Sequence, residues 1–153
     1  MSESLQDTHG PTTICFGCGP ANPDGLQIKS FVDGDAVLAD FKPRPAHQAF
    51  EGVVNGGIIG SLFDCHMNWT AAHAIMTADG LDYLPVTVTA DFHVRLRRPT
   101  PFPATLHLKA WVVSQEGNRA EIEAEMMAED KITATCTANF VAVQEGHPAH
   151  DRW

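Results

Sequence analysis

Residues 53–76 read VVNGGIIGSLFDCHMNWTAAHAIM, and the fold prediction depends on this stretch. Apolar residues fill nearly every direction around a helix drawn through it, which is typical of a helix enclosed by other structure. The polar exceptions share one stripe. Seven residues at ~100° each return to within ~20° of the starting direction, so Gly57 and Asp64 lie on one side, about two turns apart, together with Ser61 and Asn68. We predict a buried helix over residues 56–76 with one polar stripe.

Asp64 is the residue of this predicted helix whose burial would cost the most free energy. An ionised carboxylate among apolar side chains is expensive to keep unless it is paired or has a function. We interpret Asp64 as a functional group; the alternative is a structural carboxylate tied to Asn68 or Ser61 by hydrogen bonds. For Gly56 and Gly57 the alternative is close packing or a flexible helix start.

Strand patterns flank the helix on both sides. Before it, a turn-rich stretch leads into a predicted strand over residues 26–32, and a turn at 33–35 leads into a second strand in which Val37, Ala39 and Phe41 share a face. After it, residues 86–97 alternate strictly, so that Val88, Phe92 and the other even-numbered apolar residues form a dry face. Three further strands are expected over 104–114, 119–128 and 131–143.

The order of elements is therefore β-β-α-β-β-β-β. A helix that is apolar nearly all round, beside strands with one dry face each, is best satisfied by one antiparallel sheet curled around it. This predicts an α+β fold with one long central helix. Residues 1–14 are expected to be a flexible tail, 15–143 the domain and 144–153 a C-terminal tail.

Composition and charge exclude several functional classes. A hydrophobic content of 44% with 19% charged residues is ordinary for a globular domain. The net charge of −9 argues against nucleic acid as a partner. The polar N-terminus and the lack of a long apolar run argue against a signal peptide or a membrane span, so we expect a cytoplasmic protein. Five of the ten basic residues nevertheless lie between positions 95 and 119, where they can hold a small anion: Arg95, Arg97, Arg98, Lys109 and Arg119.

The four cysteines divide into two kinds. Cys15 and Cys18 have the spacing of a metal knuckle, but no second pair follows in the sequence to complete four ligands. We expect a structural turn there and no metal; a zinc site and a redox pair are the alternatives. Cys65 and Cys136 lie in apolar patterns and are expected to pack as small hydrophobic side chains.

Several segments together resemble one known family. They are CFGCGPANPDGL at 15–26, His47 and Gln48, GVVNGGII at 52–59, LFD at 62–64 and LRRP at 96–99. The chain is similar to hotdog-fold acyl-CoA thioesterases, and most similar to the phenylacetic-acid-degradation branch. The family signature is His-Gly-Gly at the start of the central helix, with Asp nine residues after the His. Gly56, Gly57 and Asp64 match this signature, whereas Asn55 stands where the family usually has His.

The resemblance implies an assembly as well as a fold. Members of the family form dimers whose sheets join side by side, often paired into tetramers, with thioester sites at the subunit interface. The spacing agrees, since a rise of ~1.5 Å per residue puts Gly57 and Asp64 of one helix ~10 Å apart, too far to flank one carbonyl. One site is therefore expected to combine Gly57 of one subunit with Asp64 of the other.

Thioester hydrolysis assigns roles to these residues. A helix start has free backbone N–H groups and a favourable dipole, so Gly57 is the expected oxyanion donor, with Gly56 leaving room for the acyl group. Asp64 is the expected nucleophile or general base, and Asn55 the residue that hydrogen-bonds substrate or loop. The other expected substrate contacts are the pocket residues His47, Gln48, Ser61 and Asn68 and the phosphate-binding Arg97 and Arg98. For Arg97 and Arg98 the alternative is a solvated strand face. His66, next to Asp64, faces elsewhere and is expected to be a satisfied core or interface histidine.

The predicted function is hydrolysis of an acyl-CoA to free acid and CoA, without metal or organic cofactor. The expected partners are a small-molecule acyl-CoA and further copies of the chain. A non-catalytic acyl-CoA-binding protein is an alternative that Asn55 favours. A hotdog enoyl-CoA hydratase or dehydratase is another, against which the missing helix-start His weighs. A metal-binding interaction module would depend on Cys15 and Cys18 alone.

Overall fold

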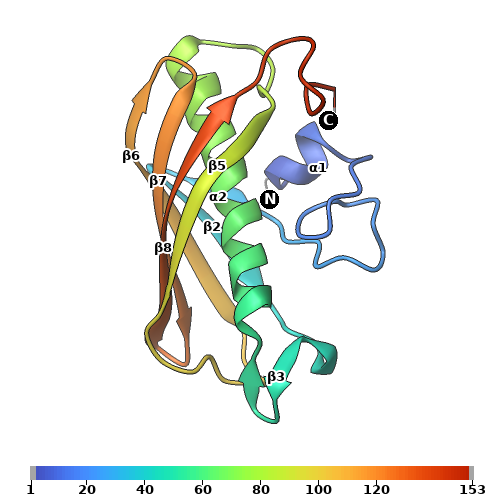
Figure 1. Cartoon of the computed structure of the whole chain (residues 1–153), viewed down its shortest axis with the longest axis vertical. Helices are drawn as coiled ribbons and strands as arrows, with labels where there is room; N and C mark the ends of the chain where they lie inside the picture. The colour runs from blue at the N-terminus through green and yellow to red at the C-terminus, as the bar shows by residue number, and fades with distance from the viewer. Residues whose placement is uncertain (1–2, 152–153) are drawn as a thin grey trace.

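A curved antiparallel sheet packs around one long helix in the structure, a computed structural model that describes residues 3–151 (Figure 1). The sheet has six strands in the order β1-β2-β6-β7-β8-β5. Every neighbouring pair in it is antiparallel. The strands are β1 (Phe31–Asp33), β2 (Ala36–Phe41), β5 (Thr87–Leu96), β6 (Leu106–Glu116), β7 (Arg119–Ala128) and β8 (Lys131–Ala142). The predicted α+β order with a central helix is confirmed.

The central helix, α2 (Gly56–Asp79), begins and ends at recognisable caps. Asn55 is the N-cap, and its side chain accepts hydrogen bonds from the first backbone N–H groups. Gly80 ends the helix in the left-handed conformation at φ 63°, which glycine adopts without steric cost, and its N–H returns to the carbonyls of Met76 and Thr77. The helix therefore runs slightly beyond the predicted end at residue 76.

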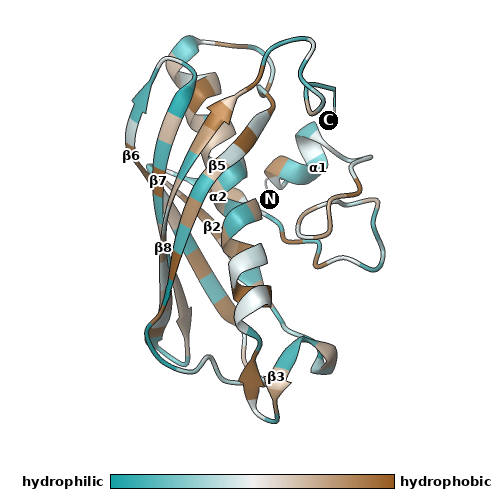
Figure 2. Ribbon diagram, in the orientation of Figure 1, coloured by the Kyte–Doolittle hydropathy of each residue, from teal (hydrophilic) through white to brown (hydrophobic). Residues whose placement is uncertain are grey.

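The core lies between α2 and the concave face of the sheet. On the helix, Leu62, Phe63, Met67 and Trp69 have no exposed surface. Each buried apolar side chain of this size contributes about 1.5–3 kcal/mol. Alternate residues of the strands face them, and Figure 2 shows the same alternation of apolar and polar positions along the ribbons. The strand residues of this core include Val37, Ala39, Leu106, Leu108, Ile122, Met126, Ala138 and Phe140.

A β-bulge in β5 corrects the predicted alternation of that strand. The register with β8 shifts between Thr89 and Asp91. Before the shift, Thr87 and Thr89 pair with β8 residues whose side chains lie on one face of that strand. After the shift, Phe92 and every second residue that follows it pair with β8 residues of that same face. One extra residue reverses the direction of every side chain that follows it. The helix-facing residues of β5 are therefore two threonines and then Phe92, Val94 and Leu96, instead of one continuous apolar row.

The N-terminal segment covers the side of α2 that faces away from the sheet (Figure 1). The predicted loose tail instead contains a short helix, α1 (Leu5–His9), capped by Ser4 and anchored by buried Leu5 and Gln6. The strand predicted over residues 26–32 begins only at Phe31, since Gln27 takes the left-handed conformation at φ 54° and the backbones of Ile28 and Ser30 hydrogen-bond to the N-terminal segment. Leu26 and Ile28 are nevertheless buried against the core, as the apolar pattern indicated.

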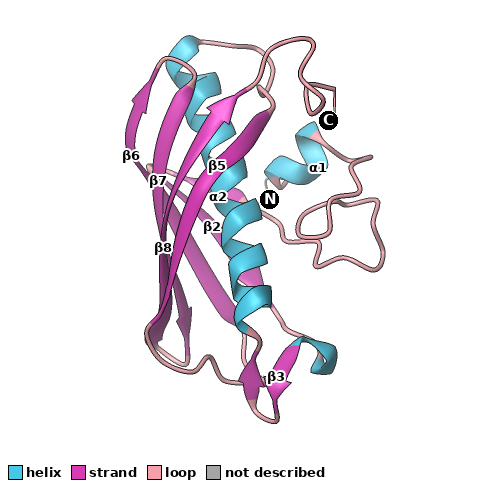
Figure 3. Ribbon diagram, viewed as in Figure 1, coloured by secondary structure: helices cyan, strands magenta, loops and turns pink. Residues whose placement is uncertain are grey.

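A small hairpin precedes the central helix. After the 3-10 turn η1 (Pro45–His47), the strands β3 (Gln48–Phe50) and β4 (Val53–Val54) pair beside the start of α2 (Figure 3). Within the expected C-terminal tail, the structure has only turns over residues 144–151. The described helices include none that is long and apolar enough to cross a membrane.

Candidate active site

Asn55 holds the start of α2 with its side chain. Its Oδ1 accepts hydrogen bonds from the backbone N–H of Gly57 at 2.7 Å and of Ile58 at 3.2 Å. Two N–H donors identify this atom as the amide oxygen, so the Nδ2 group points away from the helix end. The expected oxyanion donor, the Gly57 N–H, is thus already engaged by the residue that replaces the family histidine.

The two glycines that follow are in close contact with their surroundings. A Cβ on Gly57 would lie 2.9 Å from Asn55 Oδ1, and a Cβ on Gly56 would lie 3.2 Å from a methyl carbon of Leu96. Ser61, one turn on, donates its hydroxyl to the carbonyl oxygen of Gly57 at 3.0 Å. The glycines therefore have a structural reason to lack side chains, in addition to any contact with substrate.

Asp64 lies half-buried on the side of α2 that faces β5. The hydroxyl of Thr89 donates to its Oδ1 at 2.6 Å, a short, charge-assisted hydrogen bond that fixes the carboxylate. One turn later on the helix, Oδ1 of buried Asn68 accepts a hydrogen bond of 2.6 Å from the hydroxyl of Thr87. The polar stripe of α2 thus packs against the first half of β5, where the inward-facing residues are threonines.

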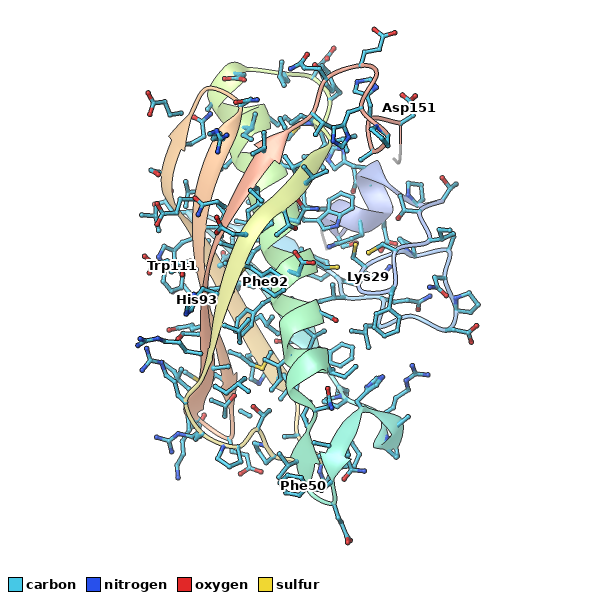
Figure 4. The ribbon with its side chains drawn as sticks, in the orientation of Figure 1. Lys29, Phe50, Phe92, His93, Trp111 and Asp151 are labelled. Atoms are coloured by element: carbon cyan, nitrogen blue, oxygen red, sulfur yellow. The ribbon has the colours of Figure 1, made fainter. Side chains whose placement is uncertain are left out.

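Sequence reasoning missed Thr87 and Thr89 because strict alternation placed them on the outer face of β5. The bulge that turns them inward leaves no signature in the sequence. A run of Thr at alternate positions, opposite a helix stripe of Asp and Asn, is the only signal that could have indicated the pairing. Figure 4 shows the consequence beyond the bulge, with Phe92 on the helix side of β5 and His93 on the outer side.

His47 and Gln48 hold the loop before the helix. His47 is buried, and its Nδ1 accepts the backbone N–H of Arg44 at 2.9 Å. Burial, followed by the positive charge of Arg44, lowers the pKa of His47, so the ring stays neutral at pH 7. The Oε1 of Gln48 accepts from the Gly52 N–H at 2.8 Å and its Nε2 donates to the Pro45 carbonyl at 3.0 Å. The carbonyl of His47 accepts the Asn55 N–H at 2.8 Å, so the loop is tied directly to the helix start.

Arg97 and Arg98 lie at a pair of surface hollows beside the helix start. A hollow of about 300 Å³ is lined by both arginines together with Gly56, Ile59 and Leu96. A wider one, of about 780 Å³, is lined by both arginines and Lys131. Their exposed guanidinium groups therefore connect open surface to the glycine-rich end of α2. A separate hollow of about 630 Å³ at the far end of α2 has none of the predicted site residues in its lining.

The five basic residues expected to cluster do not form one patch. Arg119 pairs with Val141 of β8, next to Ala142, which pairs with Thr87 at the start of β5. Arg97 follows the end of β5, and a strand of 10 residues separates the two positions. At ~3.3 Å per residue this is a distance of ~30 Å. Arg97 and Arg98 line the hollow that reaches the helix start, and Arg95 shares a separate hollow of about 440 Å³ with Arg97.

His66 is a core residue, as expected. Its Nε2–H donates to the Val37 carbonyl at 2.9 Å, which leaves Nδ1 to accept the Ser30 hydroxyl at 2.7 Å. Complete burial lowers the pKa of His66 to about 4, so the ring is neutral. It faces the N-terminal segment and β2 and plays no part in the polar stripe.

Three cysteines converge on the same helix. Cys15 and Cys18 come from the turn after α1, and Cys65 comes from α2, directly after Asp64. The sequence could not show this group, because Cys65 is 50 residues from Cys15 along the chain and only the packing of the N-terminal segment brings them together. Among residues 3–151, this is the group of side chains that could hold a metal ion.

The sequence and the structure were both compared with known proteins. Residues 51–135 match the family described as the thioesterase superfamily. No curated protein sequence matches the chain. Among solved structures, a thioesterase superfamily protein from Shewanella loihica PV-4 is 28% identical with a TM-score of 0.66, covering 82% of this chain and 98% of that one.

Two more distant structures share the fold. The PaaI protein from the phenylacetic acid degradation operon of E. coli is 16% identical with a TM-score of 0.66, covering 78% of this chain and 81% of that one. A Streptococcus mutans UA159 protein bound to acetyl-CoA is 14% identical with a TM-score of 0.63, covering 76% of this chain and 88% of that one. These neighbours identify the sheet around its central helix as the hotdog fold of thioesterases.

Proposed function

The chain belongs to the thioesterase superfamily, and we propose that it hydrolyses an acyl-CoA thioester with Asp64 as nucleophile or general base. The observation that carries this proposal is the setting of Asp64: a half-buried carboxylate held by Thr89 on a helix whose other side chains are largely apolar. The hydrogen bond from Thr89 holds the carboxylate in one position, as a nucleophile or general base requires. The PaaI-type relatives support the acyl-CoA class of substrate.

The reaction requires attack on the thioester carbonyl. Either Asp64 attacks the carbonyl carbon directly, or it takes a proton from a water molecule that attacks. The C–S bond then breaks, CoA leaves as a thiolate and takes up a proton, and water completes release of the acid in the direct route. Negative charge develops on the carbonyl oxygen, which the start of α2 can stabilise through its N–H groups and dipole.

Asn55 changes how the helix start would serve as an oxyanion site. Its Oδ1 accepts the Gly57 N–H, so a substrate oxygen must share that hydrogen or displace the side chain. Its Nδ2 group points away from the helix end and can donate a hydrogen bond to the carbonyl itself. We therefore assign Asn55 both the cap and a direct contact to substrate.

A second copy of the chain would complete the site. β5 is the last strand of the sheet, so one of its edges is free of sheet pairing within the described residues. Its helix-side residues Phe92 and Leu96 are 45% and 59% exposed, which is unusual for large apolar side chains beside a core. Pairing of β5 with β5 of a second copy would cover these residues. It would also bring Asp64 of one chain toward the partner's helix start, which the ~10 Å between Gly57 and Asp64 of one helix requires.

Arg97 and Arg98 are proposed to bind the phosphates of CoA. They line two hollows, one of which reaches Gly56, so a nucleotide held there would point its thioester toward the helix start. Guanidinium groups are well suited to phosphate oxygens. The Streptococcus mutans relative is bound to acetyl-CoA, which supports the same ligand class.

The test is release of CoA thiol from a panel of acyl-CoAs that differ in chain length and aromatic character. Asp64→Asn keeps the shape of the side chain and its contact to Thr89 but removes the charge. We expect turnover to fall by roughly 10²–10⁴-fold while the fold persists. Asp33→Asn is the matched control, because Asp33 is an exposed carboxylate of β1, at the opposite edge of the sheet from β5, and it should keep wild-type turnover. Full activity in a folded Asp64→Asn protein would exclude this assignment.

A non-catalytic acyl-CoA-binding protein is the second candidate. The observation in its favour is the Gly57 N–H, which is already engaged by Asn55 in place of the family histidine. Tight binding of acyl-CoA without thiol release from any member of the panel would establish this alternative.

A further inference from the structure

The cysteine cluster consists of Cys15, Cys18 and Cys65. Their three Sγ atoms lie within 4.8 Å of one another, and Cys15 Sγ and Cys65 Sγ are 3.6 Å apart. All three are free thiols. A disulfide would require about 2.05 Å between two of the sulfur atoms. We propose that the three thiolates bind a thiophilic divalent metal ion of the zinc class and thereby clamp the N-terminal segment to α2.

The separations of the sulfur atoms fit such an ion. Zinc binds thiolate sulfur at about 2.3 Å with tetrahedral angles, which places neighbouring sulfur atoms about 3.8 Å apart. The observed 3.6 Å between Cys15 Sγ and Cys65 Sγ is close to this value, and the third sulfur, Cys18 Sγ, lies within 4.8 Å of both. The three sulfur atoms would form one face of the tetrahedron. Cys15 is half-buried, so a water molecule or a small exogenous ligand can reach the fourth position.

The turn that carries Cys15 and Cys18 is shaped for this approach. A Cβ on Gly17 would overlap Cys65 Sγ, and a Cβ on Gly19 would lie 2.5 Å from the Cys15 backbone nitrogen. Both contacts are closer than any side chain tolerates, so only glycine allows the turn to lie against α2. The N–H of Gly19 also donates to the Cys15 carbonyl at 2.8 Å, which closes the turn.

Hydrogen-bond donors surround the sulfur atoms. The Cys18 and Cys65 thiols and the backbone N–H groups of Cys18 and Gly17 favour the Cys15 thiolate and lower its pKa. The hydrogen bond to Cys15 and burial raise the pKa of Cys18 to about 11, although hydrogen bonds with Cys65 and Trp69 act in the opposite direction. Hydrogen bonds to Cys15 and Cys18 raise the pKa of Cys65, and burial and repulsion by the charges of these two neighbours raise it further. A divalent ion would remove this repulsion.

No other residue of the described chain completes the group. Residues 3–151 contribute three ligand atoms to it, all of them sulfur. The neighbours of Cys65 are committed elsewhere, since Asp64 accepts from Thr89 and His66 contacts Ser30 and Val37. Asp64 and Cys65 point ~100° apart on the helix, Asp64 toward β5 and Cys65 toward the N-terminal segment, so the Asp64 carboxylate is not a ligand of the proposed site.

The experiment is equilibrium metal binding to the full-length protein, purified and kept under a thiol reductant that does not chelate. Zinc titrated against a chromophoric chelator should give one tightly bound ion per chain, and cobalt should produce the thiolate-to-metal charge-transfer absorption of a sulfur-rich tetrahedral site. Zinc should also raise the Tm and protect Cys15, Cys18 and Cys65 from alkylation, located by mass spectrometry.

Variants of the chain assign the ligands. Cys65→Ser and Cys15→Ser should each weaken zinc binding by more than about 100-fold, since loss of a direct ligand exceeds the cost of losing a supporting contact. Gly17→Ala should weaken it as well, because the new methyl group displaces Cys65 Sγ. Cys136→Ser is the matched control: Cys136 is a buried cysteine of β8 outside the cluster, and zinc binding should be unchanged.

Three results would overturn the proposal. They are wild-type protein that binds no zinc under reductant, cysteines that alkylate at equal rates with and without zinc, or a Cys15–Cys65 disulfide that persists in the reduced preparation. The wild-type measurements do not depend on whether any variant folds, so they decide the question by themselves.

Discussion

The two long sides of helix α2 differ in how completely they are covered. Toward the N-terminal segment, Cys65 and His66 are buried and satisfied by residues of the same chain, including Cys15, Ser30 and Val37. Toward β5, Asp64 is half-buried, and the large side chains of Phe92 and Leu96 remain exposed. Two residues adjacent in sequence, Asp64 and Cys65, thus have opposite environments. The closed side stabilises the fold, and the open side is where substrate and a second subunit can be added.

The largest effect should come from testing whether the open side is completed by a partner. Asp64→Asn and Gly57→Val are each expected to be inactive, the second because a branched side chain displaces Asn55 Oδ1 and covers the N–H. If each site is shared between subunits, a dimer of one Asp64→Asn chain and one Gly57→Val chain has one site with both substitutions and one site with neither. Activity should return to about half that of wild type per mixed dimer.

Proof that mixed dimers have formed is needed as the control, for example by mass spectrometry of differently tagged chains. If sites were built within one chain, every site would carry one lesion and mixing would restore nothing. Inactive mixed dimers would therefore show that the open side of α2 does not form a site shared between two subunits.

The next largest effect is on the pH dependence of the free energy of unfolding, to which the closed side of α2 contributes. The pKa of His66 is lowered from 6.5 to about 4 by burial. Between these values the unfolded chain binds a proton that the folded chain does not, so the free energy of unfolding falls as pH decreases from about 6.5 to about 4. A shift of this size corresponds to up to about 3 kcal/mol, measured by urea unfolding across that range.

Two variants isolate His66 in that measurement. His66→Gln should lose its share of the pH dependence, whatever its stability at pH 7. His107→Gln should retain it, because His107 is exposed and contacts only the exposed Asp40 among its hydrogen-bond partners. Equal pH profiles for wild type and His66→Gln would mean that His66 is not held neutral by the closed side.

A smaller effect is expected from removing Arg97 and Arg98, the arginines beside the start of α2. Replacing Arg97 and Arg98 by Ala should raise KM for a full acyl-CoA by about tenfold and weaken its dependence on salt. A pantetheine thioester, which lacks the nucleotide, should be unaffected. Arg119→Ala is the matched control, because this exposed arginine lies at the opposite end of the sheet. Equal loss for both substrates would show that the arginines do not contact the phosphates.

The smallest effect should separate the two roles of Asn55. Asn55→Ala removes the helix cap and should lower stability by about 1 kcal/mol, whereas Asn55→Ser keeps a capping oxygen and should cost less. Both variants lack the Nδ2 group, so both should lose about tenfold in kcat/KM if it donates to the substrate. Full activity of Asn55→Ser would restrict Asn55 to its role as a cap.

Much of the fold could be predicted because its signals are local. The apolar helix that begins after Asn55 and the hairpin-length connections of β6, β7 and β8 depend on neighbours along the chain. The strand predictions were wrong where the backbone conformation of a single residue changed the structure around it. Gln27 in a left-handed conformation ended a predicted strand, and the bulge after Thr89 reversed the side chains of half of β5.

The amino-acid sequence alone specifies the helix and its polar stripe, because a periodic pattern of apolar residues indicates which side of a helix is buried wherever the rest of the chain lies. It also determined that Asp64 would be an unusual carboxylate and that His66 would face elsewhere. Three contacts depend instead on how the chain packs in space: Thr89 holds Asp64, Asn55 engages Gly57, and Cys65 joins Cys15 and Cys18. These contacts depend on a register shift, a side-chain rotamer and the packing of a distant segment. Each of them is set by the sum of many weak contacts across the fold, and no short stretch of sequence records that sum.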